Sequence, residues 1–296
     1  MVENKKILNF GSLNLDFVYK VEHFVCEGET TSALSRQEFC GGKGLNQSIA
    51  LSRAGANVFH MGSVGVDGEA LVEKLRKNNV DVTCVRTSEQ PTGHAIIQVD
   101  TQGKNCILIY GGANRFITEA QIDKCLKRFT RGDILLLQNE TNCRDYMINA
   151  AHQMGMYVVL NPSPIDRDLI QSRAISNVDM LILNEVEGYQ ITQKHQPSEI
   201  CMKLREMFPN CSVVLTLGSQ GVVYYSQDVF LSQEAFKVND VVDTTAAGDT
   251  FTGYFLASML RGESVSCALK IACKASAVAV TRSGASDSIP YINEIV

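Results

Sequence analysis

The sequence predicts an α/β protein of three layers, in which helices cover both faces of a mainly parallel sheet and a smaller β-sheet lies beside it. Strand-sized apolar runs alternate with amphipathic stretches along most of the chain, which is the pattern of βα units. Two extended segments interrupt this alternation. The chain has 296 residues, of which 45% are apolar and 20% charged, so it is typical of globular proteins and long enough to bury a large core.

The alternation predicts strands with helices between them. β-rich runs place strands at residues 7–10, 58–61, 134–137, 157–160, 180–183 and 213–217. Apolar residues recur at helical spacing in the stretches 68–78, 119–129 and 197–207. In the first of these stretches Leu71, Val72 and Leu75 are apolar while lysine and arginine lie on other faces, so we expect such helices to cover the sheet.

The two interruptions lie at residues 16–40 and 92–110. In the second, the alternating runs 94–100 and 105–110 flank the turn Thr101-Gln-Gly-Lys104, which predicts a β-hairpin. The two excursions, at about 14–40 and 92–112, are therefore expected to form one small sheet, a lid over an edge of the main body. Because the chain carries no linker, repeat or low-complexity tract, residues 1–296 are expected to form a single α/β domain.

Composition excludes several classes of function. Lysine and arginine total 27 against 32 aspartate and glutamate residues, a net charge of −5, so no overall positive field attracts nucleic acid or anionic lipid. No apolar run approaches the roughly 18 to 20 residues that cross a bilayer, and the first residues are too briefly apolar for a signal peptide. The ten cysteines contain no C-x-x-C pair, which favours reduced thiols in a cytoplasmic protein. The five histidines show no metal-ligand spacing.

The segment Gly41-Gly-Lys-Gly-Leu-Asn46 opens a predicted helix that continues through residues 47–54. Its glycines let a backbone approach a ligand and present free amide groups at the positive end of a helix. It is not a Walker A motif, because Lys43 is followed by Gly44 instead of serine or threonine. A glycine turn before a helix is more often only a turn. The unusual feature is that Lys43 and Asn46 are interleaved with the glycines.

A second segment, Val241-Val-Asp-Thr-Thr-Ala-Ala-Gly-Asp249, precedes an apolar helical stretch. The small side chains of Ala246, Ala247 and Gly248 leave the amides at the helix start uncovered, which predicts an anion hole. Asp249, in the first turn, lies within hydrogen-bonding reach of whatever those amides hold. The simpler alternative is that Asp249 only complements the helix dipole, but that role does not require the Ala-Ala-Gly approach.

Taken together, the two segments resemble the signatures of the ribokinase-like (PfkB-type) carbohydrate kinases. Further elements occur in the family's order over nearly the whole chain: Asn14-x-Asp16, Gln138-Asn-Glu140, Asn184-Glu-Val-Glu187, Thr216-Leu-Gly-Ser-Gln-Gly221 and Ala279-Val-Thr-Arg-Ser-Gly-Ala285. The resemblance implies the ribokinase-like fold, a three-layer α/β/α body with a small β-sheet lid. It also implies a phosphotransferase that uses an alcohol group as acceptor.

In this family, an aspartate at the position of Asp249 accepts the proton of a sugar hydroxyl while the γ-phosphoryl group of ATP is transferred in line to that oxygen. By the same resemblance, the amides of Ala246, Ala247 and Gly248 stabilise charge on the phosphoryl oxygens. The residues implied to bind the sugar are Asn14, Asp16, Gly42, Lys43, Gly44, Asn46, Glu140 and Asp249. Their types suit a polyol, because carboxylates accept hydroxyl protons while asparagine and lysine donate.

The remaining family elements imply the nucleotide and cation sites. The residues implied to contact the nucleotide are Asn184, Thr216, Gly218, Ser219, Gly221, Gly248 and Cys273. Glu187 is implied to organise Mg²⁺, mostly through water, which fits an ion that keeps much of its hydration. A monovalent cation, K⁺, is implied beside the anion hole, mainly on backbone carbonyls, at Asp243, Thr245, Ala279, Arg282, Gly284 and Ser288.

Two of these elements have simpler explanations that the residues leave open. Asn184 with Glu187 three positions later is also an ordinary helix-capping pattern. The segment 216–221 is also an ordinary turn between a strand at 213–217 and one at 222–225. Cys273 is a departure from the family, which often has asparagine or histidine beside the adenine, because a thiol is a weak hydrogen-bonding group.

The resemblance implies transfer of the γ-phosphoryl group of ATP to the O5 hydroxyl of D-ribose, giving D-ribose 5-phosphate. Deoxyribose, fructose or a nucleoside are alternative acceptors for the same chemistry. A non-catalytic sugar or nucleotide sensor is the alternative from another class, and a dehydrogenase is disfavoured because the dinucleotide-binding fingerprint is missing. The edges and apolar face of the lid sheet imply a homodimer joined lid to lid, with no nucleic acid or membrane partner.

Overall fold

The computed structural model describes residues 5–227 and 229–296. The strands of its main sheet are β1 (Ile7–Phe10), β4 (Val58–Val64), β5 (Asp81–Thr87), β8 (Ile134–Gln138), β9 (Tyr157–Asn161), β10 (Met180–Asn184), β11 (Ser212–Thr216), β12 (Val222–Ser226) and β13 (Val229–Gln233). They form nine strands in the order β13-β12-β11-β10-β9-β8-β1-β4-β5. Every neighbouring pair from β11 to β5 is parallel, while β12 and β13 join antiparallel at one edge.

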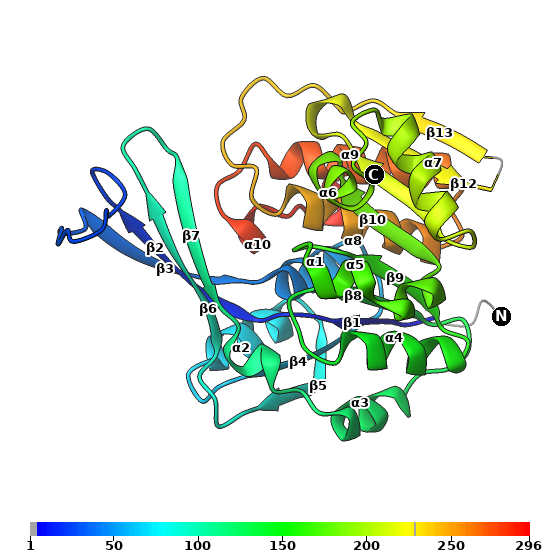
Figure 1. Cartoon of the computed structure of the whole chain (residues 1–296), viewed down its shortest axis with the longest axis horizontal. Helices are drawn as coiled ribbons and strands as arrows, with labels where there is room; N and C mark the ends of the chain where they lie inside the picture. Colours follow the sequence, from blue (N-terminus) through cyan, green and yellow to red (C-terminus); the bar gives the residue numbers. More distant parts are fainter. Residues whose placement is uncertain (1–4, 228) are drawn as a thin grey trace.

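Helices lie on both faces of this sheet (Figure 1). The α-helices are α1 (Lys43–Arg53), α2 (Glu69–Lys77), α3 (Glu119–Leu126), α4 (Arg144–Gln153), α5 (Arg167–Gln171), α6 (Glu185–Thr192), α7 (Pro197–Met207), α8 (Ala247–Leu260), α9 (Val265–Ala279) and α10 (Ala285–Ser288). Short 3-10 helices lie at Gly112–Arg115, Arg173–Asn177, Gly218–Gln220 and Ile292–Glu294. The apolar side chains of α1, α2, α8 and α9 pack on one face, and those of α3, α4, α5 and α7 pack on the other.

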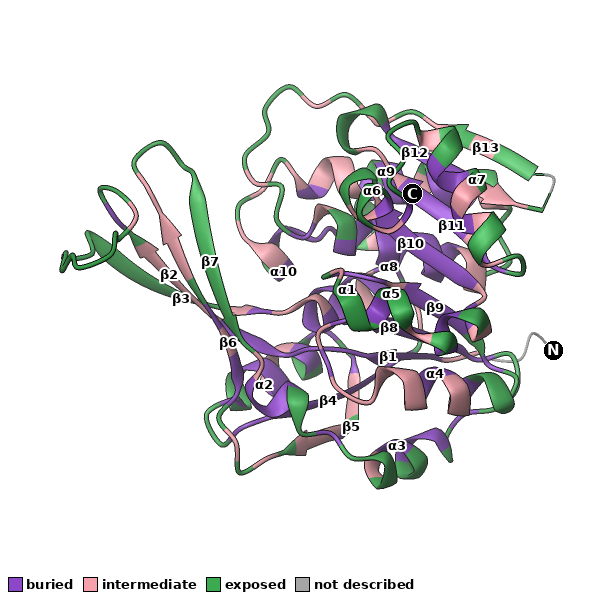
Figure 2. Ribbon diagram, viewed as in Figure 1, coloured by how far each residue is buried: buried purple, intermediate pink, exposed green. Residues whose placement is uncertain are grey.

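The core is divided by the sheet into two apolar layers. Ile7 and Leu136 belong to one layer, whereas their chain neighbours Leu8 and Leu135 belong to the other. Successive side chains of a strand point to opposite faces, so strands covered on both faces must be apolar at nearly every position. This is why the central strands read as short continuous apolar runs, and Figure 2 shows these strands buried.

A second sheet contains β2 (Asn14–Lys20), β3 (Ser35–Gly41), β6 (Gly93–Val99) and β7 (Asn105–Tyr110), in the order β3-β2-β6-β7. The pairs β2–β3 and β6–β7 are antiparallel and β2–β6 is parallel. The sheet projects away from the main body (Figure 1), and all six residues of β7 are exposed. The prediction that both interruptions join in one small sheet, including the hairpin, is confirmed.

The predicted layers are confirmed, although the element ends differ by a few residues and some elements were not predicted. All six predicted strands exist, and β4 extends three residues further, to Val64. The strand predicted to end at 217 ends at Thr216, because the next residue begins a turn. Strand β5 was not predicted because it is only partly buried and mixes Asp81, Thr83 and Arg86 with apolar residues.

Candidate active site

Most of the residues singled out by the sequence lie at the carboxyl end of the main sheet. Asn14 follows β1, Glu140 follows β8, and Asn184 ends β10. Parallel strands end at the same edge of a sheet, so loops from distant parts of the sequence meet there. The amino-terminal ends of α1 and α8 approach the same place, which brings the two signature segments together.

Asp249 is 8% exposed and accepts hydrogen bonds on both carboxylate oxygens. Asn46 donates from Nδ2 to Oδ2 at 3.0 Å, and Gln47 donates from Nε2 to Oδ1 at 2.9 Å. Asn46 was expected here from the sequence, whereas Gln47 was not. The only sequence signal for Gln47 is a long polar residue inside a helix whose neighbours are small or apolar.

Helices α1 and α8 approach closely because α8 carries a glycine where they cross. A Cβ atom on Gly253 would lie 2.4 Å from the Cβ of Ala50, which is far inside van der Waals contact. A larger residue at this position forces the helices apart. The close crossing is what allows the side chains of Asn46 and Gln47 on α1 to reach a carboxylate on α8.

Lys43 lies among three carboxylates. Burial alone lowers the pKa of its ammonium group, but Asp249, Glu140 and Glu187 outweigh that effect and raise the pKa above its usual value. Lys43 is therefore charged at neutral pH. These partners come from α8, from the loop after β8 and from α6, so one side chain links the expected sugar, phosphate and magnesium regions.

Glu140 is held by the turns after β1 and before α1. Its Oε2 accepts a short hydrogen bond from the hydroxyl of Ser12 and another from the backbone amide of Lys43 at 3.3 Å. The amide of Gly44 donates to Ser12 Oγ at 3.4 Å, while Gly42 caps α1 with a positive φ of 97°. Ser12 is fully buried and was missed by the sequence analysis, because a lone serine carries no motif.

Asp16, on β2, lies against the glycine turn. A Cβ on Gly41 would lie 1.9 Å from Asp16 Oδ2, so only glycine leaves room for this carboxylate. Burial and then the nearby charge of Glu140 raise the pKa of Asp16 to about 7. The carboxylate is therefore poised to change its charge near neutral pH.

Asn14 is oriented by Asn114. Asn114 donates from Nδ2 to Asn14 Oδ1 at 2.8 Å, and its own Oδ1 accepts from the amide of Leu13 at 3.0 Å. Since Asn14 Oδ1 is the acceptor in this pair, its Nδ2 is the group left to donate elsewhere.

The start of α8 has the small-residue approach that the sequence predicted. Ala246 precedes the helix in a left-handed conformation, with φ 61°, and a Cβ on Gly248 would meet no atom within 4 Å. Ser276 donates to the carbonyl of Ala247 at 2.9 Å and holds this turn against α9. The amide of Ala247 donates to the carbonyl of Thr244 at 3.2 Å, so this amide already has an acceptor within the chain.

Asn184 and Glu187 form a capping box at the start of α6. Asn184 Oδ1 accepts from the amide of Glu187 at 2.9 Å, and Glu187 Oε2 accepts from the amide of Asn184 at 3.0 Å. The two residues therefore do cap α6, as the simpler explanation of this pair proposed. This cap occupies one oxygen of each side chain and fixes Glu187 at the edge where Lys43 lies.

The other expected nucleotide residues lie in a turn and in a helix core. Thr216 ends β11, and Gly218 and Ser219 are exposed in the tight turn that leads through Gly221 to antiparallel β12. The turn interpretation is thus also correct. Cys273 is instead 7% exposed and packs in the apolar layer of α8 and α9. Burial raises its thiol pKa to about 11, so the side chain is a neutral packing group.

The segments expected to hold a monovalent cation lie side by side. Asp243 accepts from the amides of Thr245 at 2.8 Å and Gly284 at 3.0 Å, which ties the two loops together. The amide of Val242 bonds to the carbonyl of Val280 at 2.8 Å. The Arg282 side chain turns away to pair with Glu294, and Ser288 donates to the carbonyl of Ala285 at 2.8 Å.

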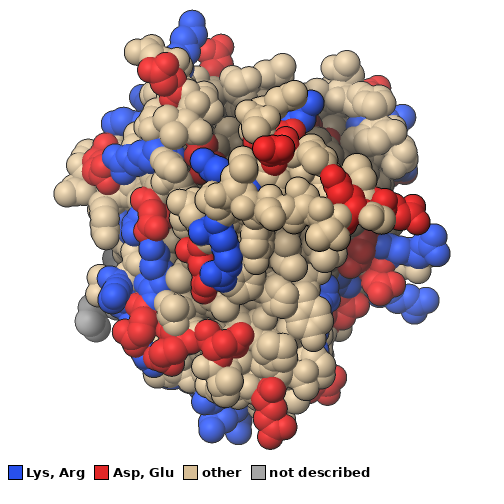
Figure 3. All heavy atoms as spheres, turned by 90° about the vertical axis from the view of Figure 1, so that its left-hand side faces the viewer, with Lys and Arg blue, Asp and Glu red and all other residues tan. Residues whose placement is uncertain are grey.

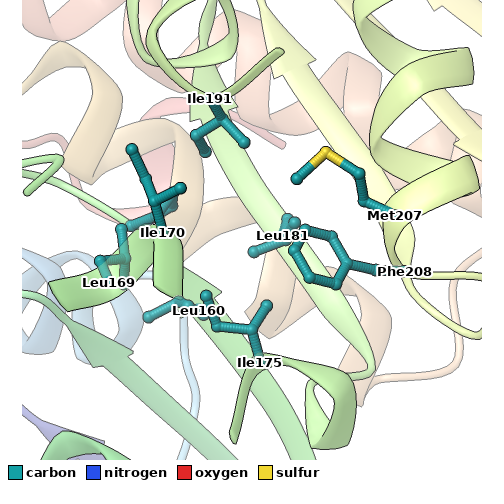
Figure 4. Close-up of a pocket in the computed structure, with 9 residues that line it drawn as sticks. Leu160, Leu169, Ile170, Ile175, Leu181, Ile191, Met207 and Phe208 are labelled. Atoms are coloured by element: carbon teal, nitrogen blue, oxygen red, sulfur yellow. The ribbon is translucent and has the colours of Figure 1, made fainter. Parts of the chain in front are cut away.

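A narrow cavity is lined by none of these residues, and Figure 4 shows its walls. Its walls are Leu160, Pro162, Leu169, Ile170, Ile175, Leu181, Ile191, Met207 and Phe208. Its volume of about 10 Å³ is room for no more than one water molecule, and an apolar cavity of this kind stays dry. It is a packing defect beneath α5 and carries none of the predicted site residues.

Comparison with known proteins gives the same picture over the whole chain. The model of the pfkB family carbohydrate kinases matches residues 4–292. Ribokinase of Haemophilus influenzae is 33% identical, covering 98% of this chain and 97% of that protein. Ribokinase of Staphylococcus aureus is 32% identical, with 98% of each chain covered.

Solved structures agree with the sequence comparison. The structure of Arabidopsis thaliana ribokinase complexed with ribose and ATP superposes with a TM-score of 0.87 at 28% identity, covering 98% of this chain and 97% of that one. Ribokinase from Cryptococcus neoformans in complex with ADP gives a TM-score of 0.88 at 29% identity, with 98% of each chain covered. The chain therefore belongs to the pfkB family of carbohydrate kinases.

Proposed function

We propose that this kinase transfers the γ-phosphoryl group of ATP to O5 of D-ribose, giving D-ribose 5-phosphate and ADP. The observation that carries the proposal is the position of Asp249. Its carboxylate lies in the first turn of α8, beside uncovered backbone amides, and is hydrogen bonded to the helix that the Gly41–Gly44 turn opens. The likeness to ribokinases over 98% of the chain supports ribose as the acceptor.

In the proposed reaction, Asp249 accepts the O5 proton as that oxygen bonds to the γ-phosphorus. The bond between this phosphorus and the bridging oxygen of ATP breaks, and ADP leaves with the electron pair. The amides of Ala246 and Gly248 stabilise the transferred group, and removal of one such donor typically costs about 10² to 10³ in rate. Most of the catalysis then comes from positioning and charge stabilisation.

The sugar is proposed to lie against the polar groups at the junction of the two sheets. Asn14 donates, Asp16 and Glu140 accept, and Asn46 offers Oδ1, a buried oxygen that has no partner within the described residues. Buried polar groups that need a hydroxyl reject analogues lacking it. The arrangement therefore selects a polyol of matching stereochemistry.

We also propose that Mg²⁺ binds together with the ATP phosphates. Within residues 5–227 and 229–296, no cluster of three or more His, Cys, Asp or Glu side chains could hold a metal ion. Glu187 uses one oxygen to cap α6, and its other oxygen suits a magnesium-bound water. When bound, the ion would neutralise phosphate charge.

K⁺ is proposed beside the anion hole, in the loops that Asp243 joins. The K⁺ site is proposed because segments 242–245 and 280–284 are in contact. Their backbone carbonyl oxygens are the ligands expected for such an ion. Turnover is expected to fall severalfold when K⁺ is replaced by tetramethylammonium at constant ionic strength, measured by ADP release. Equal turnover in both salts contradicts the K⁺ site.

A panel of acceptors in a coupled ADP-release assay tests the proposed function. Ribose is expected to give the highest kcat/KM, with deoxyribose, fructose and nucleosides below it, and the product should be phosphorylated at O5. The main competitor is deoxyribose, since deoxyribokinase of Salmonella typhi is 29% identical over 96% of this chain. A nucleoside or deoxyribose used far more efficiently than ribose contradicts the assignment. A sensor, in contrast, binds sugar without any turnover.

The raised pKa of Asp16 predicts how ribose use depends on pH. Below its pKa of about 7 the carboxyl group is protonated and loses acceptor capacity, so kcat/KM for ribose is expected to fall as the solution becomes more acidic. The fall approaches about tenfold per pH unit for a single group. A series of kcat/KM measurements from about pH 8 to about pH 6 checks this, with Asp16→Asn as a control that lacks the titrating group. A flat wild-type profile contradicts the assignment of Asp16 to ribose binding.

The small sheet is proposed to act as a lid and as the contact of a homodimer. On β7, Ile107 is 51%, Leu108 67% and Ile109 55% exposed, and β3 and β7 are edge strands. The side of the molecule that bears this sheet has a central uncharged band flanked by charges of both signs (Figure 3). Exposed apolar strands at a sheet edge are sites of association.

Size-exclusion chromatography with light scattering tests the dimer. We expect about twice the monomer mass of 32.5 kDa for the wild type and the monomer mass for Leu108→Glu. Lys104→Glu, in the turn at the end of the same hairpin, is the matched control and should remain dimeric. A monomer at micromolar wild-type concentration contradicts the proposal.

A cytoplasmic location is proposed from the cysteines. All ten are free thiols, and Cys26 and Cys106 are exposed, which suits a reducing compartment. In the described part of the chain, no helix is both long and apolar enough to cross a membrane.

A further inference from the structure

A continuous chain of buried polar side chains leads from Asp249 into the centre of the main sheet. Its members, in order, are Gln47, Gln138, Asn9, Ser48 and His60. They come from α1 and from the adjacent strands β8, β1 and β4, and none is more than 1% exposed. We call these five residues the polar chain.

Gln47 is the member that touches Asp249, and its amide can face only one way. Its Oε1 accepts from Gln138 Nε2 at 2.6 Å, and its Nε2 donates to Asp249 at 2.9 Å and to Asn161 Oδ1 at 3.1 Å. Asn161 uses its own Nδ2 on the carbonyl of Ile182, so Oδ1 is left as an acceptor. A reversed Gln47 amide would place an oxygen against two acceptors.

The remaining members fix the direction of Gln138. Its Nε2 also donates to Asn9 Oδ1 at 2.9 Å, and Asn9 Nδ2 donates to Ser48 Oγ and to the carbonyl of Gly44, each at 2.8 Å. Ser48 Oγ also forms a hydrogen bond with His60 Nδ1 at 2.8 Å. Gln138 therefore donates to both of its neighbours, and the hydrogen bonds run from it toward Asp249 through Gln47 and toward Ser48 through Asn9.

The far end of the polar chain is electrically neutral. Burial lowers the pKa of His60 to about 3, so the imidazole carries no charge at neutral pH. The chain therefore does not supply a proton to Asp249. Its effect on Asp249 is to fix the orientation of the Gln47 amide that donates to the carboxylate.

Packing alone does not account for the polar chain. Its strand members lie in the middle of a sheet whose other buried positions are apolar in most cases, Ser63 being an exception. Replacing both partners of a buried hydrogen bond with apolar groups of the same shape is often nearly neutral for stability, whereas leaving one partner alone costs about 1 to 3 kcal/mol. A network of this kind specifies one arrangement of its members.

We propose that Gln47, oriented by Gln138, is a positioning residue that holds the carboxylate of Asp249 in line with the acceptor oxygen of the sugar. This inference rests on the proposed function, because it assigns Asp249 the role of proton acceptor. Asn46 holds the other oxygen of the same carboxylate. The two donors together leave the carboxylate little freedom to rotate.

The first test is Gln47→Leu, which keeps the volume and removes the donor. Misplacing a reacting group by about 1 Å can cost about 10² in rate, so kcat is expected to fall about tenfold to a hundredfold with both KM values within about threefold. Ser52→Ala is the matched control, because it removes a hydrogen bond from α1 to the carbonyl of Asn78 outside the polar chain. Its kcat should be unchanged. A Gln47→Leu enzyme with wild-type kcat overturns the proposal.

A double-mutant cycle separates positioning from a structural role. If Gln47 acts through Asp249, Gln47→Leu is expected to cause no further loss of residual turnover in an Asp249→Asn background. A purely structural residue lowers turnover by the same factor in both backgrounds, and that result overturns the proposal. Gln138→Leu is a second variant in case Gln47→Leu does not fold. It should lower kcat at least about threefold with KM unchanged, and an unchanged kcat counts against the chain.

Failure of the proposed function gives a different result. In that case the wild type turns over another acceptor of the panel better than ribose, and the cycle is then measured with that acceptor. The polar chain is contradicted only when wild-type turnover is present and is insensitive to Gln47 and Gln138.

Discussion

Asp249→Asn is expected to abolish nearly all turnover while ribose and ATP still bind. General-base catalysis contributes about 10² to 10⁴ in rate, and the asparagine keeps the size of the side chain but cannot take the hydroxyl proton. Its new amide group also faces the donors of Asn46 and Gln47, so one of these contacts is lost. We therefore expect kcat to fall by about 10³ or more.

Two measurements check this result. Isothermal titration should give a ribose Kd within about fivefold of the wild type, and the ADP-release assay should give the loss of kcat. Asp240→Asn, an exposed aspartate in the loop before α8 that has no role in the proposed site, is the control and should keep wild-type turnover. Retained turnover in Asp249→Asn removes this residue from the mechanism.

Gly248→Ala is expected to impair catalysis without destabilising the protein. A Cβ at this position meets no atom within 4 Å and the backbone is helical, so the methyl group fits the ligand-free protein. Alanine is favoured over glycine in a helix by about 0.5 to 1 kcal/mol. In the complex, however, the methyl group is expected to occupy space beside the amide that we propose receives the phosphoryl group.

The expected effect is a fall of about 10² in kcat/KM for ATP, with a melting temperature equal to or above that of the wild type. Calorimetry and initial-rate measurements give both quantities on the same preparation. Ser266→Ala, an exposed change in the first turn of α9, is the control for helix propensity. Gly248→Ala with wild-type kcat/KM for ATP shows that the phosphoryl group binds elsewhere.

The parts of the site that could be predicted from sequence are those whose functional groups all lie within one short segment. The Gly41–Asn46 and Asp243–Asp249 segments each combine an uncovered helix start with a side chain of matching chemistry, and the two together are far more specific than either alone. The fold followed from apolar periodicity, which is strong for central strands such as β8 and weak for β5, where half-buried positions tolerate polar residues.

Other features could not be predicted, because their partners are distant in the chain. Gln47 looks like any glutamine in a helix until residues 138, 161 and 249 surround it. The role of Ser12 can be recognised only in the structure, where its hydroxyl donates to Glu140. The pair Asn184 and Glu187 shows a different limit, since a capping box and a place beside the phosphates use the same residue types. Sequence spacing alone does not separate these two roles.

The crossing of α1 and α8 has a consequence for the order in which this enzyme gains activity. Asn46 and Asp249 are 203 positions apart, so the carboxylate is synthesised long after the amide that holds it. Domains generally fold as units, and α8 and α9 supply much of the apolar layer on one face of the main sheet. A nascent chain is thus unable to consume ATP until its last helices have been made and have docked, so one face of the sheet is covered and the carboxylate is placed at the same stage of synthesis.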